Sequence, residues 1–289
     1  MLRAIARYCV YRGIANAPET ELQGALVPQG LTSRQADDAA GSEGTVWRDT
    51  IDLMLELGIA DRRDGELAFR DDVLTDLAAE ETSTFRRVLR SIILAPEHNS
   101  GLWDHADGDA WPSSAAREFS RIAVWLLETQ VGELSGEAYE VARRSIEGPT
   151  KLVENVEQWR VFLRWAEAVG LTSRVGTFQL PDPTVAIEEE LPDVFLSKED
   201  LPALKVRDGL LSAIPVLRNG AYSSGLDRFL VDKPRRLHAE AGPALAFALS
   251  RLERRGVIGF DRRSDSDQLV LSDPHSTDNP THITWRGAQ

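Results

Sequence analysis

Cysteine is almost missing from this sequence, since Cys9 is the only one in 289 residues. A single cysteine cannot close a disulfide within the chain or supply a zinc site made of several cysteines, so both frameworks are excluded. Such a composition suits a reducing compartment, and we expect a cytoplasmic protein. Cys9 falls on the apolar stripe of the first predicted helix, which indicates a buried small side chain rather than a nucleophile.

Long apolar runs are also missing. No stretch approaches the roughly 18 consecutive apolar residues of a membrane-spanning helix. The opening MLRAIARYCVYRG is too short and too interrupted by arginine to be a secretory signal. With 42% hydrophobic and 27% charged residues, the composition is that of a globular protein with a real core, and no membrane association is expected.

The motifs of common catalytic sites are absent too. The chain has no G-x-x-x-x-G-K-[ST], no G-x-G-x-x-G after a strand, no G-x-S-x-G and no H-E-x-x-H. The acidic run Glu188–Glu190 is typical of a solvated surface. No histidine has a context that suits a general base, because all lie in predicted loops or near a chain end: His98, His105, His238, His275 and His282. We therefore expect no enzyme activity, no cofactor and no metal.

The densest polar stretch is EHNSGLWDHADGDAW. It contains six residues of the types that bind metals: Glu97, His98, Asp104, His105, Asp107 and Asp109. Their spacing matches neither a zinc site nor a calcium loop, and an exposed acidic loop explains them. An enzyme built around a metal in this loop is the last-ranked alternative.

Charge is distributed unevenly along the chain, whose formal net charge is −13. Residues 1–199 carry 20 Lys and Arg against 35 Asp and Glu, whereas residues 200–289 carry 13 against 11. The acidic part disfavours nonspecific binding to phosphates. Contact with nucleic acid is therefore electrostatically permitted mainly in the C-terminal third.

One pattern occurs more than once. WRDTIDLMLELGIADRRDGELAF, starting at Trp47, and WRVFLRWAEAVGLTSRVGTFQL, starting at Trp159, both reach a glycine after the same number of residues. In each, apolar residues at helical spacing indicate an amphipathic helix that Gly58 or Gly170 stops. Val46 and Trp47 fall on the apolar stripe of the first helix, and Trp47 and Trp159 are expected as matched core residues. The alternating stretch that follows predicts a two-stranded hairpin.

A looser third copy, GPALAFALSRLERRG, ends at Gly256. It continues as VIGFDRRSDSDQLVLSD, in which four apolar residues predict two strands: Val257, Phe260, Leu269 and Leu271. Two further helical segments precede each copy, and helix–helix–helix–hairpin is the order of a winged helix-turn-helix. The predicted fold is mainly α (α+β), with three tandem winged helix-turn-helix units that carry short β-hairpin wings.

The expected domain boundaries follow this repeat. The first unit takes residues 1–78, a connecting helix and acidic loop take 79–112, and the second unit takes 113–183. The three prolines of PDPTVAIEEELPDVFLSK indicate a linker over 184–199. The third unit and a C-terminal tail take 200–289.

A winged helix binds DNA through the exposed face of its third helix and through its wing. In the first unit that face carries four charged residues, which we assign to protein partners because the carboxylates repel phosphate: Arg48, Asp49, Asp52 and Glu56. Arg62 and Arg63 occupy its wing. In the second unit arginines and glutamates balance, so neither kind of partner is favoured.

The third unit is the better candidate for DNA. Eight cations lie just before its last helix, late on that helix or in its wing: Lys233, Arg235, Arg236, Arg251, Arg254, Arg255, Arg262 and Arg263. The alternative is that arginines at the end of a helix interact with its dipole and cap its carbonyls. Both interpretations stay open at this point.

The stretch FRRVLRSIILAPEHNSGLWDHADGDAW, with AREFSRIAVWLLETQ after it, resembles the DpdG-like proteins. These proteins are encoded with bacterial 7-deazaguanine DNA-modification and restriction islands. The resemblance implies an accessory subunit of an anti-phage defence system. It brings no catalytic motif that could be carried over to residues of this chain.

Two functional hypotheses follow. The first is a non-enzymatic winged-helix scaffold or adaptor in a DNA-acting complex, such as a DNA-modification or restriction system, which binds protein subunits and can touch DNA through the third unit. The second is a sequence-specific DNA-binding transcriptional regulator, whose third unit would dock on DNA, normally as a dimer. The sequence leaves the partner proteins, any DNA preference and the oligomeric state open.

Overall fold

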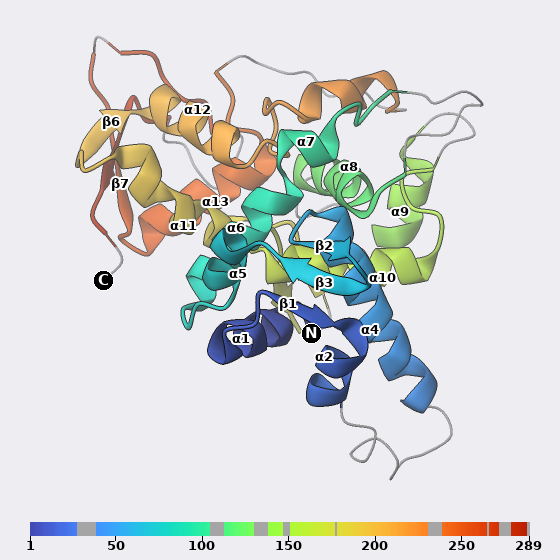
Figure 1. The fold of residues 1–289 in the computed structure, drawn as a ribbon. Helices are drawn as coiled ribbons and strands as arrows, with labels where there is room; N and C mark the ends of the chain where they lie inside the picture. The colour runs from blue at the N-terminus through green and yellow to red at the C-terminus, as the bar shows by residue number, and fades with distance from the viewer. Residues whose placement is uncertain are drawn as a thin grey trace. The chain divides into compact units, whose positions relative to one another are not determined.

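The computed structural model of the chain describes residues 1–27, 39–104, 113–129, 138–146, 151–176, 178–230, 239–264, 266–271 and 279–287, without the side chains of 39–45 and 178. The chain divides into two compact units, Met1–Ile93 and Leu94–Gln289. The described residues are mainly helical with small antiparallel sheets, which confirms the predicted mainly α (α+β) class (Figure 1). No described helix combines the length and the apolar character that a membrane crossing needs.

The N-terminal unit contains a three-stranded sheet with the strand order β1-β3-β2. Its elements are, in chain order, α1 (Leu2–Arg12), β1 (Asn16–Pro18), α2 (Glu19–Leu26), α4 (Ala39–Glu56), β2 (Ala60–Arg63), β3 (Glu66–Phe69), α5 (Asp71–Leu77) and α6 (Thr82–Ile93). Cys9 of α1, Leu22 of α2 and Met54 of α4 are fully buried, and they mark the core where these three helices meet.

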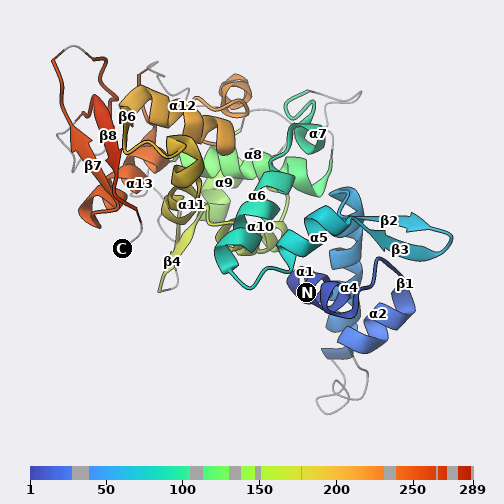
Figure 2. The same ribbon diagram turned by 60° about the vertical axis from the view of Figure 1, so that its left-hand side comes forward.

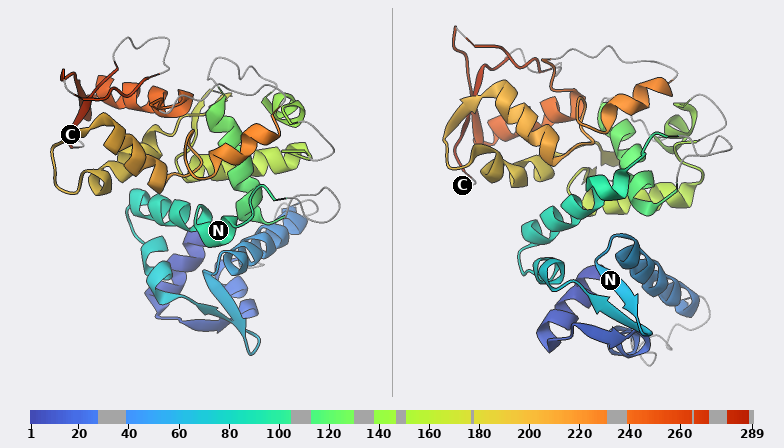
Figure 3. Two further views of the ribbon diagram at one scale, coloured as in Figure 1. Left: turned by 90° about the horizontal axis from the view of Figure 1, so that it is seen from above. Right: turned by 45° about the horizontal axis from the view of Figure 1, so that its top comes forward.

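The C-terminal unit is organised around α8 (Ala115–Glu128), of whose 14 residues eleven are buried. This helix packs against five other helical elements, α7, α9, α10, α13 and η2 (Figures 2 and 3). The other elements are α7 (Pro96–Asn99), α9 (Ala138–Arg144), α10 (Val156–Ala168), β4 (Ser173–Val175), β5 (Phe178–Leu180), α11 (Thr184–Phe195), β6 (Asp200–Pro202), α12 (Ala203–Ala213), η2 (Ser223–Arg228), α13 (Pro243–Arg254), β7 (Ile258–Asp261) and β8 (His282–Trp285).

Helices α4, α10 and α13 end in the same way. Gly58, Gly170 and Gly256 have φ angles of 61°, 78° and 74°, a left-handed conformation that favours glycine. The next residue is apolar and buried, and its N–H bonds the carbonyl five positions back, in the pairs Ile59–Met54, Leu171–Ala166 and Val257–Leu252. This Schellman arrangement satisfies carbonyls at the helix end and turns the chain into the following strand. The predicted helix stops are confirmed.

The two matched tryptophans are core residues, as predicted. Trp47 is 2% exposed and Trp159 is 7% exposed. Trp159 meets Trp125 of α8 edge to face, with ring centroids 6.3 Å apart. Such aromatic pairs add to the stabilisation that burial alone provides.

Two sheets in the chain share one topology. In the sheet β6-β8-β7, as in β1-β3-β2, the first strand pairs with the last one, and the last one pairs with the middle one. Pro18 and Pro202 each end the first strand and immediately precede the next helix. A proline suits this place because the first turn of a helix leaves its N–H groups without intrahelical partners.

The predicted linker over 184–199 is wrong, because Thr184–Phe195 form the helix α11. Ala186, Ile187, Leu191 and Phe195 are buried, and α11 packs on both α12 and α13. Two of the three prolines precede the helix, where a missing N–H costs little. The apolar spacing therefore outweighs the one proline inside the helix, Pro192.

The predicted second strand of the third hairpin is also wrong. β7 pairs with β8, His282–Trp285, rather than with the segment that holds Leu269 and Leu271. That segment makes an isolated parallel bridge from Val270 to Glu240. β8 also pairs with β6, so it lies in the middle of the sheet and forms hydrogen bonds on both of its edges.

The segment Leu94–Trp103, which contains α7, is anchored inside the C-terminal unit. The Trp103 indole N–H donates to the Tyr222 carbonyl at 2.7 Å, and the Tyr222 hydroxyl donates to the Leu94 carbonyl at 2.7 Å. Arg121 of α8 donates to the Leu102 carbonyl at 2.9 Å, and burial lowers the pKa of its guanidinium to about 10. Gly225 lies flat against the Trp103 ring, where a Cβ atom would be 2.0 Å from Cδ1.

Replacing Gly225 with alanine tests this contact. We expect Gly225→Ala to lower the free energy of unfolding by about 1–3 kcal/mol, because the added methyl group forces the indole out of its site. The matched control is Gly24→Ala in α2, where a Cβ meets nothing within 4 Å and removal of glycine stabilises by about 0.5–1 kcal/mol. Urea unfolding followed by tryptophan fluorescence measures both, and equal effects of the two substitutions would contradict the anchor.

Candidate functional site

The outer face of α4 carries the four residues assigned to protein partners. Arg48, Asp49, Asp52 and Glu56 are all exposed. Val46, predicted on the apolar stripe, is also exposed. Three carboxylates and one guanidinium thus lie on a helix face whose opposite side holds the core.

The β2-β3 hairpin, predicted as the wing of the first unit, is tied to α2. Glu19 of α2 accepts the Trp47 indole N–H at 3.2 Å with one carboxylate oxygen and pairs with Arg62 at 3.0 Å through the other. Arg63 pairs with Asp61 at 3.1 Å. Both arginines of the hairpin therefore have carboxylate partners within the unit, which makes them less available to a phosphate.

In the second predicted unit, arginines of α10 and β4 also pair with nearby carboxylates. Arg160 pairs with Glu157 at 2.6 Å, and Arg174 of β4 pairs with Glu167 at 3.1 Å. Neither a strongly basic nor a strongly acidic face results, in agreement with the balance expected from the sequence.

The helix α13 is enclosed along most of its length. Seven of its residues are buried, and they run through the helix from its start to its last turn: Ala244, Leu245, Ala246, Ala248, Leu249, Ser250 and Leu252. α8 and α11 pack against it. Its exposed side chains, Arg251, Glu253 and Arg254, lie near its C-terminal end, and Phe247 is half-buried.

The eight candidate cations of the third unit divide into three groups. Lys233, Arg235 and Arg236 lie outside the described residues. Three others form ion pairs inside the unit, namely Arg251 with Asp182, Arg255 with Glu188, and Arg263 with both Asp200 and Asp261. Arg254 and Arg262 are exposed.

Two of these ion pairs have a clear structural role. Asp182 is 2% exposed and also accepts the N–H of Thr184 at 3.1 Å, so Arg251 neutralises a buried carboxylate at the start of α11. Arg255 holds Glu188 of α11 through two hydrogen bonds, at 2.7 and 3.1 Å. Both arginines thereby join α13 to α11, a role that the sequence pattern does not reveal.

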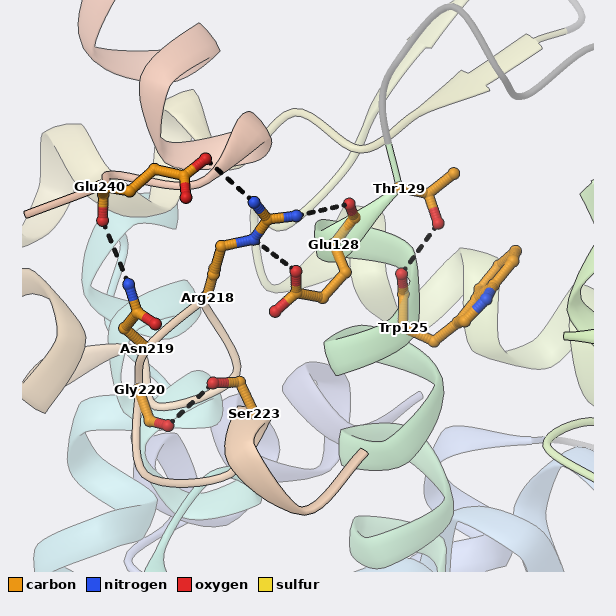
Figure 4. Close-up of polar contacts among 8 residues, drawn as sticks. All are labelled: Trp125, Glu128, Thr129, Arg218, Asn219, Gly220, Ser223 and Glu240. Atoms are coloured by element: carbon orange, nitrogen blue, oxygen red, sulfur yellow. Dashed lines mark hydrogen bonds and ion pairs between the residues drawn. The ribbon is translucent and has the colours of Figure 1, made fainter. Parts of the chain in front are cut away.

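A buried charged cluster that sequence reasoning missed lies beside the N-terminal end of α13 (Figure 4). The Arg218 guanidinium donates to a Glu128 carboxylate oxygen at 2.5 Å and to a Glu240 oxygen at 3.1 Å. The three side chains are only 11%, 5% and 8% exposed. Asn219 donates to the Glu240 carbonyl at 3.2 Å. The cluster connects the end of α8, the turn before η2 and the segment before α13.

The acidic loop offers no metal site in the part that the structure describes. Among the described residues, no group of three or more His, Cys, Asp or Glu is placed to hold a metal ion. Glu97, His98 and Asp104 are described, whereas His105, Asp107 and Asp109 lie outside the described ranges.

Cys9 has the buried position predicted for it. It is fully enclosed, and burial raises the pKa of its thiol to about 11. The thiolate needed for nucleophilic attack is therefore scarce at neutral pH.

The structural role of Arg251 can be tested by comparing the stability of two variants, one at Arg251 and one at the exposed Arg254. We expect Arg251→Ala to lower the free energy of unfolding by about 1–2 kcal/mol, a value reduced for the half-exposed guanidinium, because Asp182 keeps a buried charge without its ion pair. Arg254→Ala, three residues later, should change it by less than about 0.5 kcal/mol. Chemical denaturation gives both values, and a larger loss for Arg254→Ala would contradict the assignment.

The cluster around Arg218 can be tested by removing one charge and then all three. Arg218→Met should lower the free energy of unfolding by about 3–5 kcal/mol, because two carboxylates stay buried without their cation. Adding Glu128→Gln and Glu240→Gln should recover a large part of this loss, since no buried charge then lacks compensation. A triple variant less stable than Arg218→Met would show that the carboxylates have other essential roles.

Comparison of the sequence with known protein families identifies one family. A family model, described as DpdG-like, matches residues 1–266. No curated protein and no solved structure matches the chain. The family match extends far beyond the LAPEHNSGLW and FSRIAVWLLETQ segments and includes the unit with the acidic α4 face as well as α13. The chain belongs to the DpdG-like family.

Proposed function

We propose that this protein is a non-enzymatic adaptor subunit of a DNA-acting complex, and that it binds a protein partner through the α4 face. The observation that carries the proposal is the contrast between α4 and α13. The first exposes three carboxylates, and the second is enclosed by α8 and α11. Carboxylates repel phosphates, and an enclosed helix cannot enter a DNA groove without losing its packing.

The same proposal includes the fold of the two similar parts. Residues of α1 to β3 and of α11 to β8 both follow the order helix, strand, helix, helix, strand, strand, with the 3-10 helix η2 added between the last two α-helices of the second part, and both sheets place the last strand in the middle. This order and strand arrangement support winged helix-turn-helix units at both places. The α8 to β5 region, with three helices and a hairpin, supports a third unit between them.

The DNA-acting context comes from the family. DpdG-like proteins are associated with bacterial DNA modification and restriction, so the partners we propose are other subunits of such a system. Trp103 of the Leu94–Trp103 segment is buried and hydrogen-bonded to the Tyr222 carbonyl, and the Tyr222 hydroxyl bonds the Leu94 carbonyl, which supports a structural role for the residues that carry the resemblance. A transcriptional regulator would need an exposed reading helix in the third unit, and the burial of α13 does not favour one.

Co-purification with the products of neighbouring genes tests the adaptor. We expect the full-length chain to recover a protein partner at physiological salt. Reversing three charges on the α4 face, with Asp49→Lys, Asp52→Lys and Glu56→Lys, should reduce recovery at least tenfold, because like charges across an interface cost several kcal/mol. The readout is the amount of partner retained on the tagged chain.

The control reverses the same number of charges elsewhere on the N-terminal unit. Glu21, Asp76 and Glu80 are exposed and lie outside the α4 face. Changing them to lysine should leave the recovery unchanged. A native chain that is always recovered alone, or an α4 variant that recovers as much partner as the control, would refute the adaptor role.

A further inference from the structure

The outer face of the sheet β6-β8-β7 carries a polar row across all three strands. Gly259 of β7 is paired with Thr284 of β8, and Thr284 is paired with Asp200 of β6. Residues paired in this way point to the same side of a sheet. The opposite side holds Ile258, Ile283 and other buried apolar residues. On the outer side Thr284 and Asp200 are half-buried, and Gly259 is covered.

Arg286 lies directly on this row. A Cβ atom at Gly259 would be 2.6 Å from Nη2 of Arg286 and 3.1 Å from its Cζ atom, so the guanidinium occupies the place of a side chain at 259. The main-chain N–H of Arg286 donates to the Val257 carbonyl at 2.9 Å and fixes the origin of the side chain. A glycine inside a strand often marks such a close approach.

The two arginines over this sheet differ in their partners. Arg263 pairs with Asp200 and Asp261, both at 3.0 Å, and so neutralises carboxylates of the outer face. For the Arg286 guanidinium, the described part of the chain provides no carboxylate within ion-pair distance and no hydrogen-bond acceptor. Arg286 is exposed, so its charge is available to a ligand.

We propose that Arg286 contacts a phosphate of a nucleic-acid backbone and that Gly259 positions it for this contact. A planar guanidinium can donate two parallel hydrogen bonds to a phosphate. The missing Cβ at Gly259 leaves room for the guanidinium against the sheet, where it is exposed to solvent. This proposal rests on the DNA-acting role proposed above, and it places the contact on the sheet instead of on α13.

A nucleic acid fits this face better than a protein does. Among the described residues after Leu196, none is an exposed large hydrophobic side chain. Protein interfaces depend on buried apolar or aromatic anchors, which this part of the surface does not provide. Exposed Arg254 and Arg262 lie near the two ends of β7 in the chain, and they add positive charge of the sign that phosphates require.

Binding of the full chain to a mixed-sequence DNA duplex, measured by fluorescence anisotropy from low to physiological salt, tests the proposal. Arg286→Ala should weaken binding several-fold at low salt and reduce the slope of log affinity against log salt by about one. Gly259→Ala should weaken binding as well, although it keeps every charge, because its methyl group displaces the guanidinium tip. The control Arg12→Ala removes one exposed arginine from the N-terminal unit.

The outcomes separate clearly. Weaker binding for Arg286→Ala and Gly259→Ala but not for Arg12→Ala, with thermal melting unchanged, supports the contact. No duplex binding at low salt, or equal losses for Arg286→Ala and Arg12→Ala, overturns it. Polyglutamate that competes as strongly as DNA and depends equally on Arg286 would assign the face to acidic protein and also overturn it. Co-purification of partners is measured without DNA. Loss of DNA binding and loss of partner binding are therefore separate results.

Discussion

The guanidinium of Arg218, buried between two carboxylates, is the contact on which the arrangement of the C-terminal unit depends. It bonds Glu128 at the end of α8 and Glu240 just before α13. Gly242, which starts α13 with φ 76°, lies so close that a Cβ there would be 2.5 Å from the Arg218 side chain. One cation thus ties the end of α8 to the segment that starts α13, a helix enclosed by α8 and α11.

That enclosure shapes the functional conclusion. A three-helix unit with a wing normally leaves its third helix free on one side, and the free side decides what the unit binds. In the N-terminal unit the free side of α4 is acidic, whereas in the C-terminal unit α13 is covered and its late arginines bond α11. The adaptor function proposed above rests on this contrast, since function depends on the exposed groups and not on the fold.

The features that the sequence predicted are local ones. The stops at Gly58 and Gly170, the buried Trp47 and Trp159, and the exposed charged face of α4 each depend on residues within a few helical turns. A left-handed glycine followed by an apolar residue is sufficient to end a helix, so neighbouring sequence contains the required information.

The features that it missed depend on distant partners. β7 pairs with β8 and not with the apolar segment around Leu269. β8 also pairs with β6, which lies far away in the chain. The ion pair of Arg251 joins residues that are 69 positions apart, because its partner is Asp182, so the local sequence pattern does not reveal it. The prolines in and before α11 favoured a linker over a helix in the sequence analysis. A proline disrupts a helix only when it lies beyond the first turn, and the sequence alone does not show where that turn begins.

The burial of Cys9 has a practical consequence. With a thiol pKa of about 11, fewer than about one molecule in a thousand carries the thiolate near neutral pH, and the side chain has no exposed surface. A cysteine introduced on the surface of either unit should therefore react with a maleimide dye while the native thiol stays unmodified. The wild-type chain is in this sense already a cysteine-free background, ready for paired fluorescent labels on α4 and on the sheet that carries Arg286.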